Sequence, residues 1–138
     1  MEKKEKKWQI ENYAWGELGR RRVEDWVFGH FREKESLANT KAIKDSFEFK
    51  YWAFPRGDRS HEPKKQKEAT EYTFIIKGEV KGWVKIDSEK KDEIRLRTGD
   101  YIIIKPGICN NLVEEVIENV QGITIKVPTK EGDTVRPC

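Results

Sequence analysis

Residues 71–80 read EYTFIIKGEV, and this stretch decides the fold of the chain. Side chains along a strand alternate between its two faces. We therefore expect Tyr72 and Phe74 to point outward, and we expect an inward-facing set made of Glu71, Thr73 and Ile75. The pair Lys77-Gly78 predicts a turn, followed at hairpin distance by a second strand over residues 80–86.

The rest of the chain repeats this pattern of short apolar runs separated by turn residues. We expect further strands over residues 25–31, 47–54, 93–97, 101–104, 112–118 and 122–127. No stretch has a long helical period, and short strands at this spacing favour a sandwich or a barrel. The predicted fold class is all-β, as a single domain over 1–138, with an N-terminal arm (1–24), a barrel (25–128) and a C-terminal tail (129–138).

The composition is that of a charged but folded chain. Of the 138 residues, 38% are charged and 36% hydrophobic, yet five Trp, four Tyr and six Phe require a core. The 28 Lys and Arg nearly balance the 25 Asp and Glu, for a net charge of +3. Because a nucleic-acid binder usually carries a patch of one charge sign, we expect weak, salt-sensitive DNA binding at most.

The abundance of Lys and Glu, together with a single Met, is a composition typical of proteins from thermophiles.

The two cysteines, Cys109 and Cys138, form neither a disulfide framework nor a CxxC metal motif. The charged start MEKKEKKW lacks the apolar segment of a secretion signal, and no apolar run approaches the ~18 residues of a membrane helix. These features predict a cytoplasmic protein with reduced thiols and no membrane partner. Cys109 is then expected to be a buried, inert thiol rather than a nucleophile.

Two segments resemble the conserved motifs of the cupin superfamily. Glu71 and Gly78 stand at the spacing of the second half of the first motif, and residues 99–107, GDYIIIKPG, are similar to the second motif. The resemblance implies a double-stranded β-helix (jelly-roll) barrel, usually a homodimer, with a pocket inside one end of the barrel.

The same resemblance implies that the usual metal site is lost. Metal-binding cupins hold iron, manganese or zinc with three His and one Glu, and Glu71 matches the Glu. The third His position falls on Asn110, while the first two fall on Lys64 and Gln66 or, with a shorter spacing, on Lys65 and Lys67. A lysine ammonium has no lone pair and repels a cation. We therefore expect no metal and no other cofactor.

Several residues are candidates for binding a ligand in the pocket: His30, Lys50, Trp52, His61, Gln66, Glu71 and Asn110. Each has a structural alternative. His61 could be a solvated loop residue, His30 a hydrogen-bonded structural histidine, Trp52 a core residue, and Glu71 one half of a rim ion pair.

Two functions remain open. One is binding of a small molecule, for which a sugar or sugar nucleotide is a candidate, without the usual metal. The alternative is an enzyme: a sugar isomerase or epimerase that uses His61 or His30 as base, or a metal enzyme with a rebuilt ligand set using His61 and Glu71. A His–carboxylate pair in the pocket would favour catalysis, and isolated polar groups would favour binding.

Overall fold

The computed structural model describes residues 23–29, 46–85, 87 and 89–138. All elements of this part of the chain are strands: β1 (Val23–Phe28), β2 (Glu48–Phe54), β3 (Lys65–Gln66), β4 (Thr70–Lys85), β5 (Lys91–Arg97), β6 (Tyr101–Ile104), β7 (Asn110–Val127) and β8 (Thr134–Val135). The predicted all-β fold class is therefore confirmed. Within these residues, no helix has the length and apolar character needed to cross a membrane.

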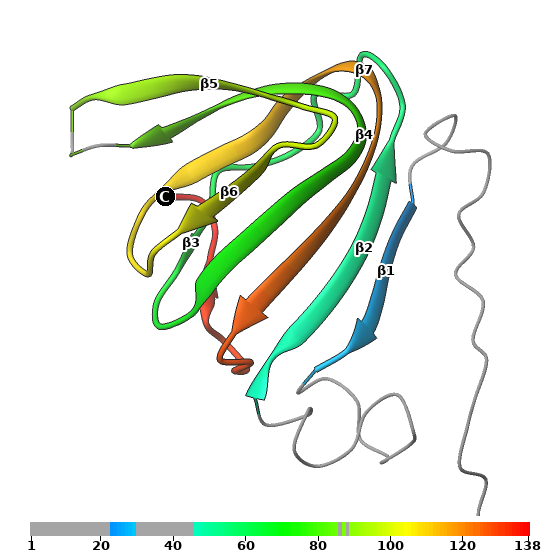
Figure 1. Cartoon of the computed structure of the whole chain (residues 1–138). Helices are drawn as coiled ribbons and strands as arrows, with labels where there is room; N and C mark the ends of the chain where they lie inside the picture. Colours follow the sequence, from blue (N-terminus) through cyan, green and yellow to red (C-terminus); the bar gives the residue numbers. More distant parts are fainter. Residues whose placement is uncertain (1–22, 30–45, 86, 88) are drawn as a thin grey trace, which may run out of the picture.

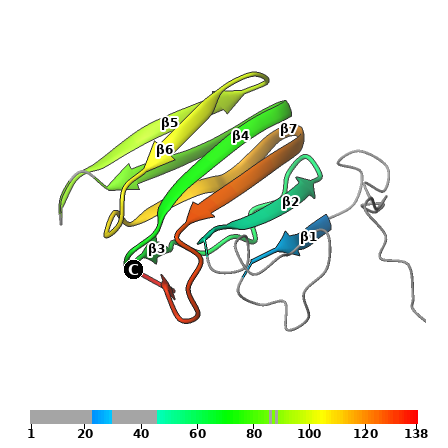
Figure 2. The same cartoon turned by 60° about the horizontal axis from the view of Figure 1, so that its bottom comes forward.

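The main sheet is antiparallel and has the order β1-β2-β7-β4-β5, with β6 also paired to β4. Figure 2 shows this order from the β5 and β6 edge to the β1 edge. The short strands β3 and β8 form a second, two-stranded sheet. The sheet curves strongly, because β4 and β7 run up one wall and turn over at its top (Figure 1).

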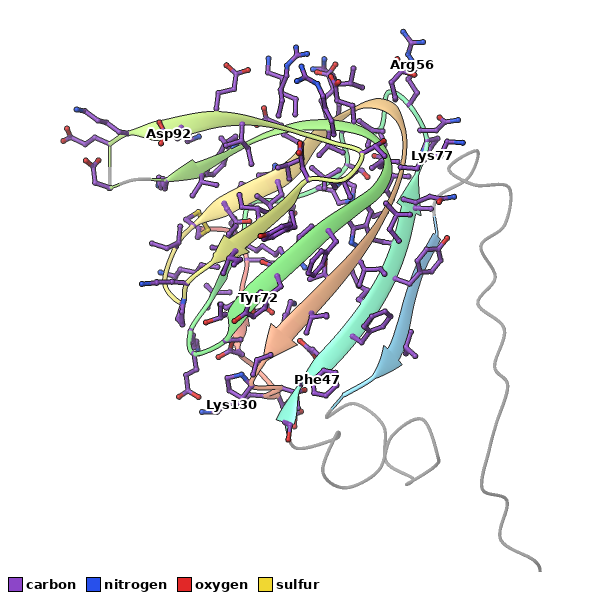
Figure 3. The ribbon with its side chains drawn as sticks, in the orientation of Figure 1. Phe47, Arg56, Tyr72, Lys77, Asp92 and Lys130 are labelled. Atoms are coloured by element: carbon purple, nitrogen blue, oxygen red, sulfur yellow. A yellow bond between two sulfur atoms is a disulfide. The ribbon has the colours of Figure 1, made fainter. Side chains whose placement is uncertain are left out.

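The turn predicted at Lys77-Gly78 is wrong, because the chain continues through it as the 16-residue strand β4. In the same way, the two strands predicted over 112–118 and 122–127 are parts of the 18-residue β7. The pairing of β4 with β7 shifts register on both sides of Lys77, which is labelled near this bend in Figure 3. Gly78 has φ +105°, and a Cβ there would stand 2.2 Å from the carbonyl oxygen of Asn119. Bulges at a glycine therefore bend the strand without ending it.

The predicted facing of β4 is confirmed. Phe74 is 37% exposed, Tyr72 is half-buried, and the inward set is 2% exposed at each position, namely Glu71, Thr73 and Ile75. The upper part of the barrel is filled by an apolar cluster that includes Trp52, Phe54, Ile75, Val80, Val116 and Val120. The lower part of the same inner face is polar, so the barrel has an apolar end and a polar end.

One glycine on β7 makes room for the largest inward side chain. Gly122 pairs with Trp52 across β2 and β7, and a Cβ at Gly122 would stand 2.1 Å from Cζ2 of Trp52. The indole therefore lies flat over the backbone of β7. Trp52 is only 2% exposed, and its place in the barrel depends on this missing side chain.

The expectation of reduced thiols is wrong, since Cys109 and Cys138 form a disulfide. The C-terminal tail returns to the barrel because Val135 and Thr134 of β8 pair with β3. The C-terminus then lies beside the start of β7, which follows Cys109 (Figure 1). Cys109 is buried and bonded, so it is neither an inert thiol nor a nucleophile.

Candidate functional site

The polar end of the barrel contains a cavity of about 400 Å³. Strands β2, β4 and β7, the segment between β2 and β3, and the C-terminal tail all contribute to its wall. Its polar lining includes the side chains of Lys50, His61, Lys64, Glu71, Thr124 and Arg136. Residues far apart in sequence thus converge on one small volume.

Strand register arranges the inner face in rows. One row crosses from Lys50 on β2 to Thr124 on β7 and Thr73 on β4, and all three side chains line the cavity. The next row toward the end of the barrel crosses from Glu48 to Lys126 and Glu71. Polar groups therefore form a floor, in which every second residue of each strand takes part.

The ion pair of Lys64 with Glu71 lies at the centre of this floor. Nζ of Lys64 donates a hydrogen bond to Oε1 of Glu71 at 2.6 Å, and both side chains are largely buried. Lys64 is held by a two-way backbone bridge, since its N–H and C=O each bond to Asn110 at 2.9 Å. Of the two spacings left open, the one that includes Lys64 therefore brings a side chain against Glu71. Lys67, by contrast, is exposed.

The electrostatics of Glu71 are dominated by neighbouring ammonium groups. Burial alone would raise the pKa of Glu71, but the charges of Lys64 and Lys126, with a smaller effect of Lys50, outweigh burial and hold this pKa below its usual value. The carboxylate is therefore ionised at neutral pH. Its second oxygen, Oε2, is buried and has no hydrogen-bond partner among the described residues.

Lys126 is a second buried cation beside Glu71. It is 4% exposed and lies 3.7 Å from Oε1 of Glu48. Burial, together with the charge of Lys64, lowers the pKa of Lys126 to about 8, although the carboxylates of Glu71 and Glu48 act in the opposite direction. Charges of alternating sign therefore run from Glu48 through Lys126 and Glu71 to Lys64.

Aromatic rings form the wall above the polar floor. The rings of Trp52 and Phe54 stack at 5.2 Å, and the imidazole of His61 packs edge-on against Phe54 at 4.3 Å. Nε1 of Trp52 donates a hydrogen bond to Oγ1 of Thr124 at 3.0 Å, which in turn lies 3.1 Å from Oγ1 of Thr73. This network fixes the indole and both threonine hydroxyls.

The structure brings together most of the residues singled out in the sequence. Four of them line the cavity, namely Lys50, Trp52, His61 and Glu71. Gln66 and Asn110 are buried behind the cavity wall; Gln66 accepts a hydrogen bond from Thr134, and Asn110 donates one to the carbonyl of Ile108. His30 lies outside the described residues.

Among the lining residues that sequence reasoning missed are Lys64, which is the partner of Glu71, and Thr124 and Arg136. Thr124 could have been found from the alternation of β7. Arg136 carried no such signal, because it reaches the cavity only through the pairing of the tail with β3.

The donor set does not fit a divalent transition metal. Of the four positions aligned with metal ligands, one carries a carboxylate, Glu71, and the ammonium of Lys64 lies against it. Gln66 and Asn110 offer only amides, which are weak ligands for such metals. Across the described part of the chain, no group of three or more His, Cys, Asp or Glu is placed to hold a metal ion.

No protein-family model and no curated protein matches this chain. Solved structures do. An uncharacterised protein with a double-stranded β-helix domain from Klebsiella pneumoniae matches with a TM-score of 0.59 and 14% identity, over 92% of this chain and 96% of that one. Peruvianin-I, a cysteine peptidase from Thevetia peruviana latex, matches with a TM-score of 0.59 and 15% identity, over 87% and 68% of the two chains.

Oxalate decarboxylase from Bacillus subtilis matches with a TM-score of 0.58 and 16% identity, over 68% of this chain. This chain spans about a quarter of the decarboxylase, since the match covers 24% of it. At such identities, the similarity establishes the fold and leaves the chemistry to the residues of this chain.

Proposed function

We propose that this chain, which has the cupin-type double-stranded β-helix fold, binds a small polar molecule in the cavity at the polar end of its barrel, without a metal ion. The observation that carries the proposal is the state of Glu71. Glu71 lines the cavity, its Oε1 is bonded to Lys64, and its Oε2 is buried without a hydrogen-bond donor among the described residues. A buried ionised oxygen left without a donor is costly, and a ligand hydroxyl supplies one.

The shape and lining of the cavity support a small molecule. About 400 Å³ lies within the usual range of small-ligand sites, and an aromatic wall above a floor of hydroxyl and charged groups is typical of them. Trp52, Thr73 and Thr124 are fixed by their mutual hydrogen bonds, so the wall is preorganised. Sugars and other polyols suit such a surface.

The enzyme alternative is less well supported. It required a His–carboxylate pair, and Glu71 is paired with Lys64 instead of His61. His61 contributes its ring to the wall beside Phe54. An ammonium held by a carboxylate is a fixed binding group and a poor proton acceptor at neutral pH.

A thermal-shift screen of small hydroxylated metabolites, run with and without EDTA, tests the proposal. Hits are repeated on Glu62→Trp, which places an indole at an exposed lining position, and on the matched control Glu62→Gln. We expect hits that are insensitive to EDTA, are kept by Glu62→Gln and are lost in Glu62→Trp. A screen without hits, or hits that all require a divalent metal, would contradict the proposal.

We also propose that two chains pair through the outer face of β4 and β6. Four large apolar side chains are exposed there, Phe74, Ile76, Tyr101 and Ile103, and the rings of Phe74 and Tyr101 stack at 5.6 Å. Such a patch on a sheet is typical of an interface. Light scattering should give twice the chain mass for the parent and the monomer mass for Tyr101→Glu; a monomeric parent would contradict this.

Finally, we propose that the chain works in the cytoplasm of an organism from a hot habitat. Cytosolic disulfides are rare in mesophiles but common in hyperthermophiles, and the Lys- and Glu-rich composition is of the same kind. A melting temperature within the mesophilic range of about 45–65 °C would contradict this assignment.

A further inference from the structure

The charged groups around the cavity are not balanced. Three cations line it, Lys50, Lys64 and Arg136, against two carboxylates, Glu62 and Glu71. Lys64 and Glu71 neutralise each other at 2.6 Å, while Glu62 and Arg136 are both exposed. The formal charges of the described lining residues therefore sum to +1, and Arg136 is the exposed cation among them.

Arg136 makes no hydrogen bond or ion pair with the rest of the described chain, although structure on both sides of it in sequence fixes its backbone. Val135, before it, pairs with Lys65 of β3, and Cys138, after it, is bonded to Cys109. A guanidinium is a planar donor suited to carboxylate and phosphate oxygens. Its position on a tethered segment at the cavity wall is that of an anion-binding group.

Glu71 also has an oxygen that accepts no hydrogen bond from the described residues. Oε2 of Glu71 is buried in the floor and lacks a donor, whereas the threonine hydroxyls above it are already bonded to each other and to Trp52. The lining of the cavity thus combines a cationic donor, Arg136, with a carboxylate, Glu71, whose second oxygen lacks a donor.

From these two observations we infer that the ligand of the proposed binding site is a small hydroxylated anion. Its acid group is bound by Arg136, and one of its hydroxyls donates to Oε2 of Glu71. This inference rests on the proposed function and narrows it to one chemical class. Carboxylates and phosphates share the required chemistry, and the volume of about 400 Å³ fits a six-carbon compound of either kind.

Calorimetric titration with three compounds of the same carbon skeleton tests the inference: D-gluconate, D-glucose 6-phosphate and neutral D-sorbitol. We expect at least one anion to bind about tenfold or more tightly than sorbitol, because a hydrogen-bonded ion pair outweighs a neutral contact. The better anion identifies the acid group as carboxylate or phosphate.

Arg136→Gln provides the site-specific readout, and Arg95→Gln, which removes an exposed arginine of β5 paired with Glu79, is the matched control. Arg136→Gln should weaken anion binding about tenfold and leave sorbitol unchanged, whereas Arg95→Gln should change neither. Unchanged melting temperature and absence of free thiols confirm that the tail of Arg136→Gln remains attached.

Three results would overturn the inference: sorbitol binding as tightly as both anions, an Arg136→Gln variant with parental anion affinity, or no binding of either anion at 20 mM. The proposed function fails separately. A neutral ligand that binds the parent but not Glu62→Trp overturns the anion assignment alone, while the absence of any ligand in the wider screen overturns both.

Discussion

Nζ of Lys64 lies 2.6 Å from Oε1 of Glu71, on the inner face of the barrel and at its polar end. In the metal-binding proteins that share these motifs, the resemblance places a divalent cation against this carboxylate. Here the chain supplies the cation itself. Oε2 of the same carboxylate is buried without a donor among the described residues, and under the proposed function it accepts a hydrogen bond from a ligand hydroxyl.

Removing the charge of Glu71 should destabilise the protein strongly. Glu71→Gln leaves the buried ammonium groups of Lys64 and Lys126 without their shared carboxylate. We expect the free energy of unfolding to fall by about 3–5 kcal/mol. Glu115→Gln removes the partner of exposed Arg59 and should cost less than about 1 kcal/mol. Guanidinium denaturation measures both. Equal losses of unfolding free energy in Glu71→Gln and Glu115→Gln would mean that the Lys64–Glu71 pair is not buried in solution.

The stability of the protein should rise with pH above 8. The pKa of Lys126 is about 8 in the folded chain and 10.5 for an ordinary lysine, so between these values the unfolded chain binds more protons. The unfavourable charged form is present below pH 8 and is relieved as the pH approaches 10.5. The free energy of unfolding should rise by up to about 1.4 kcal/mol per pH unit in this window.

The control for this pH dependence is Lys126→Met, in which the rise should be absent. Tyr51, whose pKa burial raises to about 12, acts with the opposite sign, but only above pH 10. Denaturant titrations between pH 7.5 and 9.5 therefore isolate Lys126. Parallel curves for the parent and Lys126→Met would contradict the assignment.

Gly122→Ala should disrupt the aromatic wall. Its Cβ would stand 2.1 Å from Trp52, so the indole must move and lose its hydrogen bond to Thr124. We expect the free energy of unfolding to fall by about 2–4 kcal/mol and the affinity for the ligand to decrease. Gly99→Ala, which meets nothing within 4 Å but has φ +89°, measures the cost of backbone conformation alone. Near-UV circular dichroism should change only for Gly122→Ala.

Reduction of the disulfide should weaken anion binding as much as Arg136→Gln does. Val135 makes the last strand pairing of the tail, so the bond between Cys109 and Cys138 is what holds the segment beyond it. Cys138→Ser should also lower the free energy of unfolding by about 3–4 kcal/mol, because the disulfide closes a loop between cysteines 29 residues apart in sequence. Thiol titration in denaturant should find no free thiol in the parent. Two free thiols, or full anion affinity in Cys138→Ser, would contradict the prediction.

A metal site should be recoverable on this scaffold. Lys64 contacts Glu71, and Gln66 and Asn110 are buried at the other inferred His positions, so we expect that replacing all three by His supplies neutral imidazoles near the carboxylate. Zinc calorimetry should show a gain of at least about tenfold over the parent and over the control with Lys65→His, Lys67→His and Asn110→His. An equal gain in the control would contradict the observed placement of this segment.

The sequence was sufficient where short-range periodicity decides structure. The alternation in residues 71–75 predicted which side chains of β4 enter the barrel, and the spacing from Glu71 to Gly78 predicted the fold. It failed where the deciding contact is long-range. Gly78 reads as a turn, yet the close approach of β7 makes it a bend within one strand.

The candidate site was predictable only in part for the same reason. Glu71, Trp52 and Lys50 follow from strand alternation, but two spacings were open for Lys64, and only its backbone bridge to Asn110 decides between them. Arg136 and the bond to Cys138 depend on the pairing of β8 with β3, a two-residue contact without a pattern in the sequence.

The central claim, a ligand site that functions without a metal, is tested most directly by elemental analysis of the purified parent combined with calorimetry of the same EDTA-treated sample. We expect far less than one iron, manganese, nickel or zinc per chain, and a hydroxylated anion that binds this sample as tightly as the untreated protein. About one transition metal per chain, with binding lost after EDTA and restored by that metal, would contradict it.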